Sequence, residues 1–128
     1  MHNISPELST LLSEEPELEF AVLVGSRADG SASPDSDWDI ALQWNPEIPW
    51  LERLGRTEDL RHRIAQALNT HQGKIDLIDA LDANLTMRAL IAEEGQPLAG
   101  DDSTAWARFL RRTWREIEDY YWERDHAA

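Results

Sequence analysis

Residues 19–42 read EFAVLVGSRADGSASPDSDWDIAL, and this stretch decides the fold. Residues 19–24 are apolar after the first position and rich in aromatic and β-branched types, which predicts a strand. Residues 38–42 predict a second strand by the same signal. Residues 29–36 between them are rich in Gly, Ser, Pro and Asp, which is typical of a turn. The stretch therefore predicts two strands joined by a polar loop.

The residues that carry chemistry lie at the ends of these two strands. Gly25 lacks a side chain, so its backbone can approach a phosphate closely. Ser26 adds a hydroxyl and an N–H at the start of the next turn, where anions are favoured. Asp37 and Asp39 are two residues apart, so both carboxylates point to one face of the strand. A divalent cation relieves their repulsion, and oxygen ligands completed by phosphates suit Mg²⁺. The pattern predicts metal-assisted phosphoryl or nucleotidyl transfer, and the alternative is a solvated acidic loop.

Length and composition limit the possible classes of protein. A chain of 128 residues, 41% apolar and 29% charged, predicts one soluble globular domain with its own core. The chain has no cysteine, which excludes disulfides, thiolate metal sites and a cysteine nucleophile. A net charge of −13 argues against direct nucleic-acid binding and favours a basic partner or simple solubility. The sequence shows no secretory signal and no apolar run of about 20 residues, so we expect a cytoplasmic protein without membrane contact.

Further elements are predicted around these strands. Ser5 is expected to cap a short helix that ends near Ser13, and residues 74–79 predict a third strand. Three longer helices are predicted over residues 50–70, 83–93 and 104–124. Strands interleaved with helices predict an α/β (α+β) domain, with a small mixed sheet of three to four strands flanked by helices.

The predicted helices carry apolar faces. In the helix over residues 50–70, one face at helical spacing is lined by Leu54, Arg61, Ile64, Ala65 and Leu68. The last helix has an apolar stripe of Trp106, Phe109, Leu110, Trp114, Ile117 and Tyr121. Six tryptophans are many for so small a core, so one interpretation places one or more at an interface; the alternative is core packing alone. Trp122 lies off the stripe and is predicted to help dock a partner; the alternative is that it covers the core.

A third carboxylate is predicted on the strand over residues 74–79. Alternation along this strand places Asp76 and Asp79 on opposite faces. Asp76 lies in an apolar run, where a carboxylate without a function is costly, and is therefore the candidate. The alternative is that it faces water at the edge of the sheet. Asp29 and Asp35 are interpreted as turn formers.

These residues resemble the defining pattern of the minimal nucleotidyltransferases, the smallest members of the DNA polymerase β-like nucleotidyltransferase superfamily. In that family a Gly-Ser pair is followed by Asp-x-Asp on an adjacent strand, and a later strand adds a carboxylate. The segment EEGQPLAG, residues 93–100, also looks like the end of the family's core. The resemblance covers about residues 5–100 of a single domain over residues 1–128, and leaves about residues 101–124 as an added helix.

The resemblance implies a Mg²⁺-dependent enzyme with ATP as substrate and the polymerase β-like nucleotidyltransferase fold. It implies that two Mg²⁺ ions are held by the catalytic residues Asp37, Asp39 and Asp76. It further implies that the nucleotide is bound by Gly25, Ser26 and Arg27. Asp76 would also help take the proton of the attacking hydroxyl. For Arg27, an exposed loop arginine without a role is the alternative.

Small members of this family are typically antitoxins paired with HEPN-domain ribonuclease toxins. The resemblance therefore implies a type VII-like pair in which AMP moves from ATP onto a tyrosine hydroxyl of the toxin. One alternative is a small-molecule, aminoglycoside-type nucleotidyltransferase, although such enzymes usually carry an added substrate domain. Another is a non-catalytic antitoxin that acts by binding alone, against which the complete set of motif residues argues. The acidic surface suits a basic partner.

Overall fold

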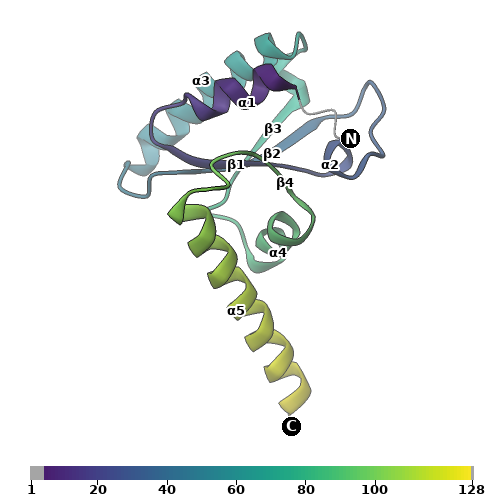
Figure 1. Cartoon of the computed structure of the whole chain (residues 1–128), viewed down its shortest axis with the longest axis vertical. Coiled ribbons are helices and arrows are strands. Elements are labelled where there is room, and N and C mark those ends of the chain that lie inside the picture. Colours follow the sequence, from purple (N-terminus) through teal and green to yellow (C-terminus); the bar gives the residue numbers. More distant parts are fainter. Residues whose placement is uncertain (1–4, 128) are drawn as a thin grey trace.

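The two strands predicted from residues 19–42 form the middle of the sheet. The structure, a computed structural model, describes residues 5–127. Strand β1 (Leu18–Val24) is antiparallel to both of its neighbours, β2 (Trp38–Trp44) and β4 (Gln96–Ala99), whereas β3 (Ile75–Asp79) lies parallel to β2. The order β3-β2-β1-β4 gives a four-stranded mixed sheet with helices on both faces (Figure 1). The predicted fold class is confirmed.

The helices are α1 (Pro6–Ser13), α2 (Ser26–Asp29), α3 (Trp50–Ala67), α4 (Leu85–Glu94) and α5 (Thr104–His126), with the 3-10 turn η1 at Gln72–Lys74. Polar side chains cap α1, α4 and α5, whereas α2 and α3 start at Gly25 and Pro49 without a side-chain cap. Ser5 accepts a hydrogen bond from the Leu8 amide (3.3 Å), as predicted, and Ser103 caps α5 in the same way. Among residues 5–127, no helix combines the length and apolar character needed to cross a membrane.

Side chains of β1 alternate between two cores. Ala21 and Leu23 face α1 and α3 and pack in a cluster that includes Leu12 and Ile64. The other face of the sheet is covered by α4 and α5, where the buried cluster contains Phe20, Val22, Val24, Ala41, Ile91, Trp106 and Phe109. Because residues 20–24 of β1 are buried on both faces, this part of the strand is continuously apolar rather than alternating.

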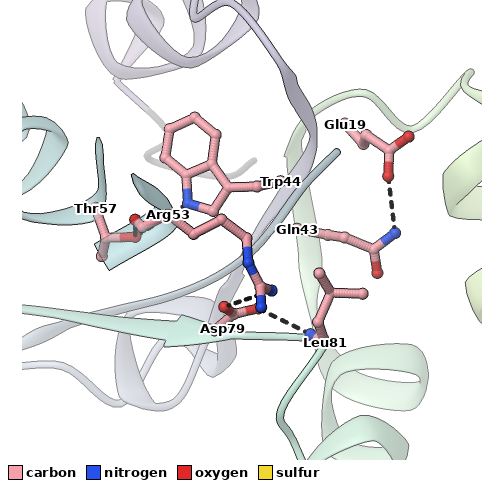
Figure 2. Close-up of polar contacts among 7 residues, drawn as sticks. All are labelled: Glu19, Gln43, Trp44, Arg53, Thr57, Asp79 and Leu81. Atoms are coloured by element: carbon pink, nitrogen blue, oxygen red, sulfur yellow. Dashed lines mark hydrogen bonds and ion pairs between the residues drawn. The ribbon is translucent and has the colours of Figure 1, made fainter. Parts of the chain in front are cut away.

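The buried face of α3 differs from the predicted one near the start of the helix. Leu54 is 44% exposed, whereas Leu60, which was not predicted, is fully buried. Polar residues contact the sheet at this end: Trp44 Nε1 donates to Thr57 Oγ1 (3.0 Å), and Thr57 Oγ1 donates to the Arg53 carbonyl (2.8 Å) (Figure 2). Apolar periodicity does not detect a contact face made of polar groups, and the prediction for Leu54 was wrong for that reason.

Only the first half of α5 packs on the sheet. Trp106 and Phe109 stack with ring centroids 5.5 Å apart, and both contact Phe20, at 4.9 and 5.2 Å. Thr113 is the last buried residue of the helix, and all side chains of residues 118–127 are exposed. Figure 1 shows the C-terminal end of α5 projecting away from the sheet.

The predicted apolar stripe of α5 is therefore only partly a core face. Trp114 and Tyr121 are exposed, so the prediction was wrong for these two residues. The helical periodicity of apolar residues continues past the edge of the body, where no sheet remains to cover them. Trp122 is 61% exposed and stacks on His126 at a centroid distance of 4.1 Å, which rules out a role as a core cover.

Candidate active site

The sheet brings the predicted site residues together at the ends of three strands. Asp39 of β2 is in register with Asp76 of β3 across the parallel pair, and with Val24 of β1 across the antiparallel pair. Gly25 follows Val24 directly, so the Gly-Ser pair lies beside Asp39. Residues in register on adjacent strands point to the same face, which places the carboxylates of Asp39 and Asp76 side by side.

Gly25 makes room for Asp39. Its backbone has φ 73° and ψ −157°, a conformation that essentially only glycine adopts. A Cβ at this position would lie 2.5 Å from Asp39 Oδ2, so any side chain would displace the carboxylate. Ser26 begins α2, and this short helix is attached to the sheet by Gln96 of β4, whose Nε2 donates to the Ala28 carbonyl (2.5 Å).

Negative charge is concentrated around Asp39. Burial raises the pKa of Asp39 above its ordinary value, and the charges of Asp76 and Asp37 raise the same pKa further. Asp37 and Asp76 are exposed, whereas Asp39 is half-buried. The three carboxylates therefore lie close enough to repel one another, and a bound cation would relieve that repulsion.

The donor set fits Mg²⁺ with phosphates in its coordination shell. Carboxylate oxygens are the side-chain ligands that Mg²⁺ prefers, and it usually binds one or two of them together with waters and substrate phosphates. Within residues 5–127, no three Asp, Glu or His side chains enclose a metal-sized site as they stand. Since Asp37 and Asp76 are exposed, their side chains have room to turn toward an ion that arrives with a nucleotide.

Asp79, the other carboxylate of β3, has a structural environment. Its Oδ2 lies 3.3 Å from Arg53 Nη1, and its Oδ1 accepts from the Leu81 amide at 2.9 Å (Figure 2). Burial raises the pKa of Asp79, although the Leu81 hydrogen bond and Arg53 act in the opposite direction. Asp79 thus closes the turn after β3 and pairs with α3, while Asp76 has no such partner among the described side-chain contacts.

Arg27 contacts the loop that leads to Asp37. Its Nη2 donates to the carbonyls of Ser36 (2.9 Å) and Pro34 (3.3 Å), and its guanidinium lies 4.3 Å from the centre of the Trp38 ring. A role for Arg27 in binding nucleotide stays a prediction, and these contacts give it a second role. Asp29 accepts from the Ser31 amide (2.9 Å), which confirms it as a turn former.

Two residues around the site were missed by the sequence analysis. Lys74 donates from Nζ to the Asp35 carbonyl (2.9 Å), and Gln96 anchors α2 as described above. Neither belongs to a motif. The one available signal was that Lys74 is the only lysine in the chain and directly precedes β3.

Gly-Ser follows one strand, Asp37 lies just before the neighbouring strand and Asp39 within it, and Asp76 is in register beyond, an arrangement that indicates a nucleotidyltransferase of the small, single-sheet class. The sequence profile of the family described as "Polymerase beta, Nucleotidyltransferase" matches residues 6–104. The chain therefore belongs to the polymerase β nucleotidyltransferase family and is a nucleotidyltransferase. The matched residues run from α1 to the first residue of α5.

Solved structures with this fold include chains from toxin–antitoxin complexes. One, described as a toxin–antitoxin with AMP-PNP, is 24% identical, with 94% of each chain covered and a TM-score of 0.68. Another is the MntA–HepT toxin–antitoxin, at 23% identity, 91% and 86% coverage and a TM-score of 0.60. A third, from Shewanella oneidensis, is a tri-AMPylated HEPN toxin in complex with an MNT antitoxin, at 22% identity, 91% and 85% coverage and a TM-score of 0.61. None of the curated proteins compared with the chain matches it.

Proposed function

We propose that this chain is the antitoxin of a cytoplasmic toxin–antitoxin pair and that it transfers AMP from ATP onto a tyrosine hydroxyl of a HEPN ribonuclease toxin. The single observation that carries the proposal is the pairing of Asp39 with Asp76 in register, beside Gly25-Ser26 and with Asp37 close enough to affect the pKa of Asp39. Support for the toxin as acceptor comes from similar folds, one of which is an MNT antitoxin in complex with a tri-AMPylated HEPN toxin.

Each site residue has a role in the proposed reaction. Asp37, Asp39 and Asp76 would hold two Mg²⁺ ions, which supply charge neutralisation at the triphosphate and an activated acceptor oxygen. Gly25 and Ser26 border the space for the triphosphate, since Gly25 presents only backbone there. The acceptor oxygen forms a bond to the α-phosphorus, the bond from that phosphorus to the β-phosphate oxygen breaks, and pyrophosphate leaves. The proton of the acceptor hydroxyl passes to the carboxylate of Asp76.

The exposure of the site supports a macromolecular acceptor. Asp37 and Asp76 are both exposed, so the proposed reaction centre lies at the surface of the domain. A small substrate is usually held in a pocket that covers most of its surface. A tyrosine on a docked protein needs no such pocket, because the partner itself covers the site.

We assign the docking of the toxin to the outer half of α5. Beyond the sheet, this helix exposes four aromatic residues, Trp114, Tyr120, Tyr121 and Trp122. On the exposed side of the same helix, Arg115 and, nearer the sheet, Arg108 and Arg111 form no ion pair within residues 5–127. Exposed aromatic and arginine side chains are the types enriched at the energetic centres of interfaces.

The test is intact-mass analysis of the toxin after co-expression with the chain. We expect the toxin to gain the mass of one or more adenylates, and peptide mapping to place them on tyrosine. The matched control is the Asp37→Asn, Asp39→Asn chain, which should leave the toxin unmodified. A toxin that is neutralised equally by this variant, without added mass, would mean that the chain acts by binding alone. ATP consumption that requires an aminoglycoside instead of the toxin would support the small-molecule alternative.

A further inference from the structure

We propose that Arg27 and Lys74 are positioning residues that hold the loop before β2 and thereby set the location of Asp37. Three successive carbonyls of this loop accept hydrogen bonds from the two side chains. Arg27 Nη2 bonds the carbonyls of Pro34 (3.3 Å) and Ser36 (2.9 Å), and Lys74 Nζ bonds the Asp35 carbonyl (2.9 Å). Asp37 follows Ser36 directly in the chain.

The loop has a rigid end and few other attachments. Residues 33–36 form a turn in which the Ser36 amide donates to the Ser33 carbonyl (3.0 Å) and the Ser33 amide donates to Ser36 Oγ (2.9 Å). Pro34 occupies the second position of this turn, where its fixed φ is favoured. A turn that is rigid in itself moves as a unit, so the position of Asp37 depends on what holds the turn to the body. Arg27 and Lys74 hold it from two sides.

The two basic residues come from the two elements that carry the rest of the site. Arg27 lies on α2, one residue after Ser26, and Lys74 lies two residues before Asp76 on the approach to β3. The Lys74 contact therefore links the strand of the third carboxylate to the loop of the first. The Arg27 contact links the Gly-Ser end of β1 to the same loop. Together they fix the separation of groups that would have to act on one nucleotide.

Arg27 also packs on Trp38, the first residue of β2, which lies between Asp37 and Asp39. Its guanidinium is 4.3 Å from the ring centre, within the range of a cation–π contact. Its Nε is buried without a hydrogen-bond partner in the described part of the chain, which is unfavourable by itself. An arginine whose only role is to meet a phosphate in solvent would keep that nitrogen in water. The burial of Nε and the two bonds from Nη2 to the loop favour a positioning role.

The assignment rests on the nucleotidyltransferase site and is independent of which acceptor the enzyme uses. Its test compares Arg27→Gln, Arg27→Lys and Lys74→Gln with the unchanged chain. The matched control is Arg56→Gln, because Arg56 also donates to a backbone carbonyl, that of Pro16 (3.5 Å), and lies over a tryptophan ring, that of Trp44 (6.0 Å), away from the loop.

The first measurement is amide hydrogen exchange of peptides that contain residues 31–37, without nucleotide. We expect exchange there to rise about fivefold in Lys74→Gln, the factor that follows from losing the net contribution of one hydrogen bond, and by more in Arg27→Gln, which loses two. Exchange in Arg27→Lys should lie between that of the unchanged chain and that of Arg27→Gln, since lysine keeps the charge but cannot both bridge two carbonyls and stack on the Trp38 ring. Arg56→Gln should leave this segment unchanged.

The second measurement is the Mg²⁺ concentration at which ATP raises the melting temperature by half of its full effect. Displacement of Asp37 should raise this concentration about fivefold or more in both glutamine variants, while saturating Mg²⁺ restores the full shift. Unchanged exchange in residues 31–37 would overturn the proposal. So would a weaker response to ATP in Arg27→Gln alone at every Mg²⁺ concentration, because that result would make Arg27 a direct nucleotide ligand. Neither measurement needs the toxin, so an unmodified toxin would contradict the proposed function without affecting this result.

Discussion

Gly25→Ala should destabilise the protein and inactivate it through a single contact. The backbone of Gly25, at φ 73° and ψ −157°, lies in a region that costs an alanine about 1–3 kcal/mol. The new Cβ would lie 2.5 Å from Asp39 Oδ2, so the carboxylate must also rotate away. The overcrowding adds about 1–2 kcal/mol, within the range measured for groups forced into packed surroundings.

A control variant and a double-mutant cycle separate the backbone part of the destabilisation by Gly25→Ala from the overcrowding part. Gly30 also has a positive φ, 83°, but a Cβ there meets nothing within 4 Å. Gly30→Ala should therefore cost only the conformational part, about 1 kcal/mol. In an Asp39→Ala background, Gly25→Ala should lose the overcrowding part, which gives a coupling of about 1–2 kcal/mol between the two positions.

Urea denaturation of the four chains of the cycle measures these values, and thermal melting checks them at about 3–5 °C per kcal/mol for a domain of this size. AMP transfer by Gly25→Ala should be lost even at temperatures where the variant is fully folded. Equal costs for Gly25→Ala and Gly30→Ala, with no coupling to Asp39, would refute the idea that glycine is needed there to leave room for the carboxylate.

Four further outcomes are expected. In the absence of metal, the Asp37→Asn, Asp39→Asn chain should fold and melt at or above the melting temperature of the unchanged chain, because repelling charges are removed. Its rate of AMP transfer, measured with radiolabelled ATP, should nevertheless fall at least about a hundredfold. ATP with Mg²⁺ at a hundredfold excess over Kd should add about 2.7 kcal/mol of stability in thermal melts, and ATP in EDTA far less. Trp122→Ala should weaken toxin binding by about 1–3 kcal/mol in calorimetric titration and leave the melting temperature nearly unchanged, whereas a lower melting temperature with unaltered affinity would make the helix end purely structural. Glu116 accepts a hydrogen bond from Arg88 and forms an ion pair with it, at 2.8 Å. The hydrogen bond lowers the pKa of Glu116 below its ordinary value of 4.5. The stabilisation from ionised Glu116 is therefore complete above pH 4.5 and is lost as the pH falls through the lower pKa that Glu116 has in the folded protein. Glu116→Gln should thus cost about 0.5–1 kcal/mol in urea melts above pH 4.5 and little below that folded-state pKa.

Local signals predicted most of the fold. Ser5, the apolar run of β1 and the breaks around residues 29–36 are features of short segments, and the structure confirms the elements they mark. The apolar periodicity of α5 was also a true local signal. It failed for Trp114 and Tyr121 because burial depends on where the sheet ends, which is a property of the assembled fold and not of the helix.

The candidate site was predictable only where a motif carries it. The Gly-Ser and Asp-x-Asp residues have a fixed spacing, whereas the pairing of Asp39 with Asp76 follows from a parallel register that no local pattern encodes. Lys74 and Gln96 bond backbone carbonyls 39 and 68 residues away in sequence. Such contacts join a side chain to a main-chain carbonyl far away in sequence, so no local pattern predicts the partner, although Lys74 is conspicuous as the only lysine in the chain. Arg27 was selected for its position in the motif, and its loop contacts emerged only from the structure.

The projecting end of α5 has a thermodynamic consequence for recognition. Residues 118–126 extend about 14 Å beyond the last contact with the body, at 1.5 Å per residue. Within residues 5–127, they are held in helical form by contacts inside α5 alone, namely its backbone bonds and local side-chain contacts such as the stacking of Trp122 on His126. The packed first half of α5 spares this segment the cost of nucleation, but a helical stretch of this length is only marginally stable in water. A partner that binds the helical form must therefore complete its ordering, and the apparent Kd rises in inverse proportion to the helical fraction of the free chain. The helix propensity of a residue in this segment thus affects the affinity even if that residue does not contact the partner. A substitution there can change the strength of the complex without any change in its interface.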